Sequence, residues 1–245
     1  MIVRTLLAAV VAGLIAGVFM TLAQQYRTVP LILHAEQYEA GHDHAARPQS
    51  LLPALAEAAN PVGPAHAHDH AADAENSGML LGVGRFGGTL LANLVIGAGF
   101  GLILTATSLM TGQAISAANG VLWGAAGWLA VHLLPAIGLP PELPGFPAAE
   151  LAARQTWWIV TVVLSAIGLY FVCLRPESWA KVGGLALIAV PHIVGAPYPD
   201  DITSNVPALL AAEFAVAALA TGLFFWIVLG VALGMINDRF ERSRA

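Results

Sequence analysis

The sequence predicts an all-α membrane protein, a polytopic bundle of about six transmembrane helices with a long His-rich external loop. Of its 245 residues, 58% are apolar and 10% are charged, less than half of the roughly 25% charge of a soluble domain. The apolar residues form runs long enough to cross about 30 Å of hydrocarbon, where helices satisfy their own backbone hydrogen bonds. The net charge of −5 disfavours a nucleic-acid binder. The single cysteine, Cys173, excludes an intrachain disulfide framework and a Cys-rich metal site.

Six apolar segments are candidate spans; the segment 207–236 contains one acidic residue, Glu213, and the others contain no Asp, Glu, Lys or Arg. The five clear ones comprise residues 5–23, 86–111, 115–139, 156–174 and 207–236. A sixth, residues 182–197, is shorter and contains Pro191, so it could be a thin span or a re-entrant half-helix. The first segment could be a signal peptide, because residues 21–23 resemble a cleavage site. Its apolar run is longer than a usual signal-peptide core, so we expect a retained anchor.

Positive charge favours six spans with both termini in the cytoplasm. In that topology six basic residues are cytoplasmic and four are external, two of them in a long loop where the positive-inside rule counts weakly. Five spans are the alternative, but they place the basic C-terminal tail outside. The predicted organisation is a first span in residues 1–24, an external loop in 25–84, a bundle in 85–236 with a Pro-rich outer loop in 140–155, and a cytoplasmic tail in 237–245.

The predicted external loop has a composition suited to metal ions. It contains six of the eight histidines and seven of the fifteen acidic residues. Residues i, i+2 and i+4 of an extended chain point to one side, so neighbouring histidines can converge on one zinc, copper, nickel or cobalt ion. We interpret the loop as a low-affinity capture segment; the alternative is a solvated loop that binds metal adventitiously. The candidate ligands are His42, His44, His66, His68 and His70.

Four polar residues of the predicted spans lie at one depth. His132, His192, Glu213 and Asn93 each fall five to seven residues from the outer end of a span, roughly 8–11 Å below the boundary at 1.5 Å per residue. Ionisable groups inside a membrane are costly and mark sites or pathways. We therefore predict a mixed nitrogen and oxygen site for a divalent metal ion. The alternative is that the histidines are neutral and hydrogen-bonded, with Glu213 protonated and paired to one of them.

Two further local patterns concern packing and the outer loop. Glycines four residues apart give spacings for close helix contact, and we interpret them as packing rather than as sites; they are Gly13/Gly17, Gly97/Gly101, Gly120/Gly124 and Gly230/Gly234. Residues 148–155 are expected to form a short helix in which Glu150 and Arg154 pair at i, i+4. This helix follows the proline-rich segment and would cap the polar layer.

Several segments of the chain resemble the CbtA family. The first is LPAIGLPPELPGFPAAELAARQTWW, residues 134–158. Others are PHIVGAPYPDD (191–201), VPALLAAEF (206–214) and FFWIVLGVALG (224–234), and the opening span and HAEQYE (34–39) are also similar. The resemblance covers most of the chain outside the His-rich loop, and residues 41–77 depart from the family's pattern.

The resemblance implies a subunit that takes up cobalt across the bacterial inner membrane in support of cobalamin synthesis. It also implies a small single-span, His-bearing partner, CbtB, and no tightly bound cofactor, cobalt(II) or a similar ion being the cargo. Members of the family are often described with five spans. Two other functions stay open, an accessory or sensing metal-binding membrane protein and an intramembrane enzyme. The sequence lacks a P-loop, so any pumping would need another subunit. It also lacks the His-Glu-x-x-His and Gly-x-Ser-x-Gly motifs, so an enzyme is disfavoured.

Overall fold

In the ranges that the structure describes, the chain consists of helices joined by loops and turns. The computed structural model describes residues 2–45 and 84–243, with the backbone alone for residues 39–45. The predicted all-α class is confirmed, and within these ranges there is no strand. The elements in order are α1 (Ile2–Arg27), α2 (Val29–Ala45), α5 (Gly84–Thr111), α6 (Gly120–Trp128), the π-helix η2 (Leu129–Leu133), α7 (Leu134–Ala136), α8 (Leu151–Leu174), α9 (Ser178–Val194) and α10 (Ala208–Arg242).

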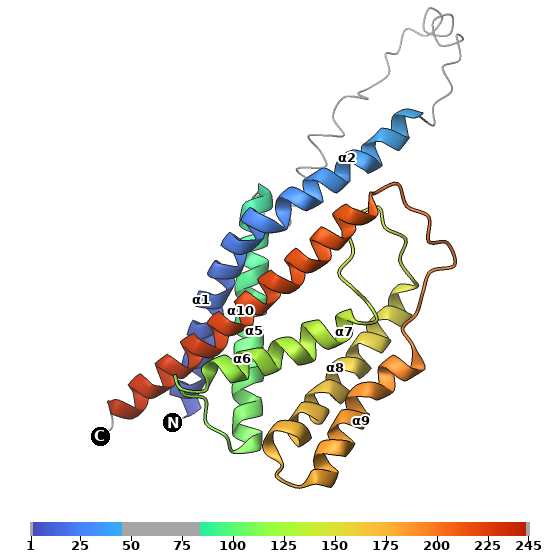
Figure 1. Cartoon of the computed structure of the whole chain (residues 1–245). Coiled ribbons are helices and arrows are strands. Elements are labelled where there is room, and N and C mark those ends of the chain that lie inside the picture. The colour runs from blue at the N-terminus through green and yellow to red at the C-terminus, as the bar shows by residue number, and fades with distance from the viewer. Residues whose placement is uncertain (1, 46–83, 244–245) are drawn as a thin grey trace, which may run out of the picture.

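By length and composition, four of the described helices could cross a membrane. These are α1, α5, α8 and α10, whereas the continuous stretch Gly120–Ala136 and the helix α9 are shorter apolar helices. The 17 residues of α9 extend about 25 Å at 1.5 Å per residue, a little less than the hydrocarbon core. The helices run alternately in opposite directions, and the two ends of the chain lie at the same end of the bundle (Figure 1). The number of spans, six or fewer, stays a prediction.

The first two helices form a nearly continuous rod (Figure 1). The backbone N–H of Thr28 donates to the carbonyl one turn earlier, and the N–H of Ile32 donates to the carbonyl of Thr28. These bonds carry the helix past Pro30, which has no N–H to donate. On α2, Glu36 forms an ion pair of 3.1 Å with Arg85 at the start of α5. Residues 29–45 fall within the predicted external loop of residues 25–84, but they are helical, and α2 extends to residue 45, beyond the apolar run.

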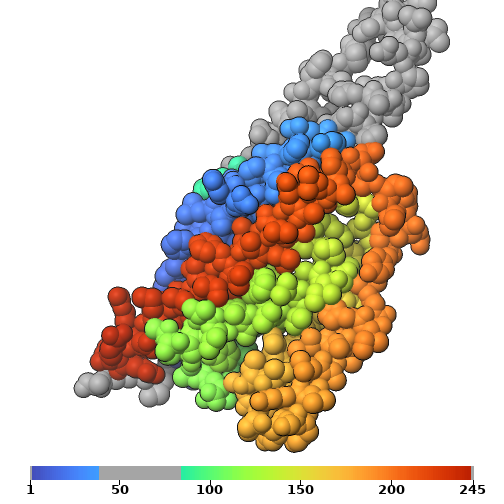
Figure 2. Space-filling view, in the orientation of Figure 1, coloured from blue at the N-terminus to red at the C-terminus, as the bar shows by residue number. Residues whose placement is uncertain are grey.

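Glycines bring two pairs of helices into backbone contact, as their spacing predicts. A Cβ added at any of these positions would collide with backbone atoms of the facing helix, which is how small residues permit close approach in membranes. Gly13, Gly17, Gly97 and Gly101 lie between α1 and α5, and Gly120, Gly124, Gly230 and Gly234 lie between α6 and the segment before it on one side and α10 on the other. Along this bundle α10 runs between α1–α2 and α6–α7 (Figure 2).

The remaining two long elements, α8 and α9, form a hairpin. They meet where Gly168 faces Gly184, and the hairpin contacts the other helices mainly through η2 and α7. Large apolar side chains on its outer surface are exposed, among them Ile159, Val163 and Val182. An exposed apolar surface of this extent is typical of a face that meets lipid.

Candidate functional site

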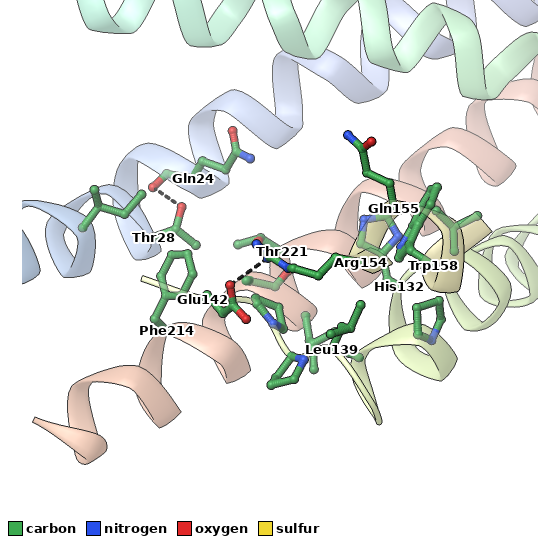
Figure 3. Close-up of a pocket in the computed structure, with 18 of the residues that line it drawn as sticks. Gln24, Thr28, His132, Leu139, Glu142, Arg154, Gln155, Trp158, Phe214 and Thr221 are labelled. Carbon is green, nitrogen blue, oxygen red and sulfur yellow. Dashed lines mark hydrogen bonds and ion pairs between the residues drawn. The ribbon is translucent and has the colours of Figure 1, made fainter. Parts of the chain in front are cut away.

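A cavity of about 910 Å³ lies at the end of the bundle where α1 meets α2. Its walls come from α1, α2, η2, α7, the loop after α7, α8 and α10, so it lies between the glycine-packed bundle and the α8–α9 hairpin (Figure 3). Much of the lining is apolar, including Met20, Trp158 and Phe214. The polar side chains of the lining are Gln24, Thr28, His132, Glu142, Arg154, Gln155 and Thr221.

His132 lies on the π-helix η2, where the wider turn changes the direction in which side chains point. Its Nδ1 accepts a hydrogen bond of 3.1 Å from Nε1 of Trp226 on α10, and the two rings meet edge to face. Gly222 makes room for the imidazole, because a Cβ there would lie 3.0 Å from Cδ2 of His132. His132 is therefore a positioned side chain in the cavity wall rather than a lipid-facing one.

An ion pair joins two parts of the cavity wall. Nη2 of Arg154, in the first turn of α8, donates to Oε2 of Glu142 in the loop after α7, at 2.7 Å (Figure 3). The predicted pairing of Arg154 with Glu150 is wrong. Glu150 is the N-cap of α8 and accepts hydrogen bonds from the backbone N–H groups of Ala152 and Ala153, which lower the pKa of its carboxyl. The cap starts one continuous helix, so residues 148–155 do not form a separate short helix.

Asn93 lies behind the cavity wall rather than in it. Its side chain is buried between α1 and α5, and Nδ2 donates to Oγ1 of Thr21 at 3.0 Å and to Oε1 of Gln24 at 2.6 Å. Gln24 in turn lines the cavity. Asn93 is thus connected to the cavity only through the side chain that it holds.

His192 and Glu213 do not line this cavity, so the structure does not bring the four predicted residues to one point. His192 packs edge to face on Trp157, on the side of α8 that faces α9, and its Nε2 is buried without a hydrogen-bond partner. Glu213 is exposed on α10. In the described part of the chain no three His, Cys, Asp or Glu side chains are grouped to hold a metal ion. A shared predicted depth does not fix the direction in which each side chain points from its helix.

The backbone carbonyl of Pro191 forms a contact between α8 and α9 that the sequence does not indicate. Pro191 lies inside α9, three residues before its end. Its carbonyl oxygen accepts hydrogen bonds from Nε1 of Trp157 at 3.2 Å and from the backbone N–H of Gly195. This oxygen is used to join α8 to α9 and is not turned toward the cavity.

Sequence reasoning missed most of the cavity lining. Gln24 and Gln155 flank the apolar runs, and they were not separated from ordinary boundary residues. Trp226 lies within the segment 224–234 that resembles the family, and no local pattern there indicates a contact with His132. The signal in the sequence that could indicate these lining residues is a polar, uncharged side chain directly next to an apolar run: Gln24 follows residues 5–23 and Gln155 precedes residues 156–174. The candidate capture residues His42, His44, His66, His68 and His70 lie outside the described residues or their described side chains.

The fold and the cavity define a class, a polytopic helical membrane protein with an open, partly polar cavity between its glycine-packed bundle and the α8–α9 hairpin. A comparison with protein-family models identifies the family: residues 2–238 match CbtA, described as "Probable cobalt transporter subunit (CbtA)". Because the match covers nearly the whole chain of 245 residues, the chain belongs to the CbtA family. Comparisons with curated proteins and with solved structures give no match.

Proposed function

We propose that this chain is the permease subunit for uptake of a divalent transition-metal ion, cobalt(II) first, across the bacterial inner membrane. Membership of a family of probable cobalt transporter subunits supports the class of cargo. In the proposed orientation both termini are cytoplasmic, with the basic residues Arg239 and Arg242 at the end of α10 on the inner side. The cavity then opens toward the outside.

The cavity at His132 is the observation that carries the proposal. It provides an imidazole, the amide side chains of Gln24 and Gln155 and the carboxylate of Glu142 within one space inside the bundle, donors that suit a borderline divalent ion. The Glu142 carboxylate is paired with Arg154 at 2.7 Å, so we propose that the ion contacts His132 first and that Asn93 acts through Gln24. Upstream of the cavity, the five candidate loop histidines would raise the local ion concentration.

Uptake of cobalt(II) into liposomes containing the purified protein tests this function. We expect uptake that falls about 10-fold or more in His132→Ala. The matched variants are His192→Ala and Glu213→Ala, which alter the two predicted residues outside the cavity. Uptake that is lost equally in all three variants would favour the four-residue layer over the cavity, whereas unchanged uptake in His132→Ala contradicts both.

A second candidate is an accessory or sensing protein that binds metal without conducting it. The observation favouring it is the fully buried apolar core at Trp226, Leu229 and Leu233, which lies along α10 beyond the cavity. Binding of cobalt(II) by the pure protein without any flux would support this second function. Flux by the pure protein excludes it.

A partner subunit is also part of the proposal. The family description is that of a subunit, and we propose a small single-span, His-bearing protein of the CbtB type as its partner. Adding that protein to the same liposomes should increase cobalt(II) uptake at low ion concentration. An unchanged uptake curve would remove the partner from the proposal without affecting the permease.

A further inference from the structure

The hydrogen bond between Trp226 and His132 limits what His132 can do. An indole N–H is only a donor, so the Nδ1 atom that accepts it at 3.1 Å carries no proton. In the neutral ring the proton is then on Nε2. A metal ion needs a free lone pair on one of these nitrogens. In this conformation one lone pair is used by Trp226 and the other nitrogen is protonated, so neither is available.

Either way of binding a metal breaks that hydrogen bond. If the ion binds Nδ1, it takes the lone pair that now accepts from Nε1 of Trp226. If it binds Nε2, the proton has to move to Nδ1, and the indole N–H then faces another N–H. Binding of an ion by His132 and the bond from Trp226 are therefore mutually exclusive.

Trp226 also occupies a particular place between two cavities. It is 1% exposed and belongs to an apolar core that includes Phe225, Leu229 and Leu233. Met20 and Val131 pack on this core and also line the cavity at His132. Trp226 is thus the core residue directly bonded to the cavity wall.

At the other end of α1 and α10 there is a second, smaller cavity of about 290 Å³. Ile115 of the core and Phe240, which packs on it, line this cavity. Arg4, Asn237 and Glu241 are among its polar lining residues, and the buried Oγ1 of Thr105 has no hydrogen-bond partner there. From Thr221 to Asn237 is about 24 Å along α10. The apolar core therefore separates two polar cavities at opposite ends of the same helices.

We propose that Trp226 is a gate operated by the transported ion: an ion that binds His132 releases the indole, and the released indole opens the core toward the second cavity. This inference rests on the proposed function, which it deepens. The indole ring of Trp226 packs tightly against Gly127, because a Cβ at Gly127 would collide with the ring. Packing against Gly127 and the bond to His132 together hold the ring in one place, and the bound ion removes the second of these restraints.

The first test measures binding of cobalt(II) to the full-length protein by calorimetry. The binding that is lost in His132→Ala is assigned to the site at His132. Trp226→Phe keeps an aromatic ring but has no N–H to displace, so we expect about 2- to 10-fold tighter binding at this site. Trp128→Phe is the matched control, because the indole of Trp128 packs on the same core but donates to the carbonyl of Leu219. It should change binding less than about 2-fold. Unchanged or weaker binding in folded Trp226→Phe overturns the proposal.

The second measurement needs no change at Trp226. Nitrogen-15 NMR of ring-labelled histidine in the wild-type protein, with His132 assigned from His132→Ala, should show the Nε2–H tautomer without metal. A proton on Nδ1 would overturn the proposal directly. This result is independent of flux, so the permease function and the gate can fail separately.

The gate itself is tested by access to Leu229, one turn beyond Trp226 and 0% exposed. In a Cys173→Ser background, Leu229→Cys should react with a small thiol reagent faster when cobalt(II) is present. Adding His132→Ala should abolish that acceleration. Equal rates with and without cobalt(II) overturn the gate.

Discussion

The two parts of the bundle are held together in different ways. The helices α1, α5, α6 and α10 meet through glycines at backbone distance, and 44% of the apolar window of α10 is buried, against 17% for α8. Within the α8–α9 hairpin, the two helices meet at one glycine contact, and the hairpin contacts the rest of the bundle mainly through η2 and α7. The cavity lies between these parts. A tightly packed unit with a loosely attached hairpin is the arrangement in which a cavity can change size without unfolding the molecule.

The largest effect is expected where the glycine contacts are closest. Gly97→Leu would place a side chain against the backbone of Gly13, and we expect a loss of about 3 kcal/mol in the free energy of unfolding. Unfolding of the purified protein in detergent measures it. Gly99→Leu, on the same helix but with open space around it, should change stability by less than about 0.5 kcal/mol. Equal losses in the two variants would contradict the account of α1–α5 packing.

The same comparison can be made within the hairpin. A Cβ at Gly184 would lie 2.6 Å from the carbonyl oxygen of Gly168, so Gly184→Ala should cost about 1–2 kcal/mol, less than Gly97→Leu. Its neighbour Gly183 has nothing within 4 Å. Gly183→Ala should be neutral or slightly stabilising, since alanine favours the helix. A cost at Gly183 as large as at Gly184 would argue against this hairpin packing.

The ion pair across the cavity should contribute less. Arg154 and Glu142 are 30% and 25% exposed in their side chains, so solvent screens the pair, and a double-mutant cycle with Arg154→Gln and Glu142→Gln should give a coupling of about 1 kcal/mol. The pair Arg175–Glu177, with exposures of 42% and 38%, is the control and should give about 0.3 kcal/mol. Thermal unfolding supplies all the values. If the coupling energy of Arg154–Glu142 is no larger than that of Arg175–Glu177, the ion pair across the cavity does not stabilise the position of the hairpin.

The smallest effect concerns the cap of α8 and its dependence on pH. The backbone N–H groups of Ala152 and Ala153 lower the pKa of Glu150 in the folded chain, so the carboxylate stabilises the folded state above the ordinary pKa of about 4.3. That contribution is lost as the pH falls through the lowered pKa. Melting temperatures of the wild type and Glu150→Ala should therefore differ at neutral pH and converge in acid. A difference that stays constant with pH would mean that the charge of Glu150 is not involved.

The sequence predicted the helices and their contacts better than it predicted the site. Apolar runs and glycine spacings follow from local patterns, and these predictions are confirmed for the helices of the bundle. Depth follows from position in a run, but rotation about the helix axis does not. Glu213 is nine residues before Gly222 on α10, half a turn away at 100° per residue, and Gly222 faces His132. Glu213 therefore lies on the opposite face of α10, and the sequence does not reveal this because it does not show which face of α10 meets His132.

Other features of the site depend on contacts that no local pattern indicates. The π-helix at His132 and the pairing of Arg154 with Glu142 are tertiary arrangements. The continuation of α1 into α2 could not be predicted for another reason, because hydropathy does not report where a helix ends. Hydropathy marks where an apolar run ends, whereas the backbone bonds at Thr28 and Ile32 show that the helix does not end there.

The glycine contacts of α10 also constrain how the protein is assembled. Its partners α1 and α6 precede it in the chain, so during synthesis both are made while the groove that α10 fills is still empty. Until α10 arrives, Gly120 and Gly124 have no backbone opposite them. Insertion of α10 is therefore the step that closes these contacts and completes the packing of the bundle.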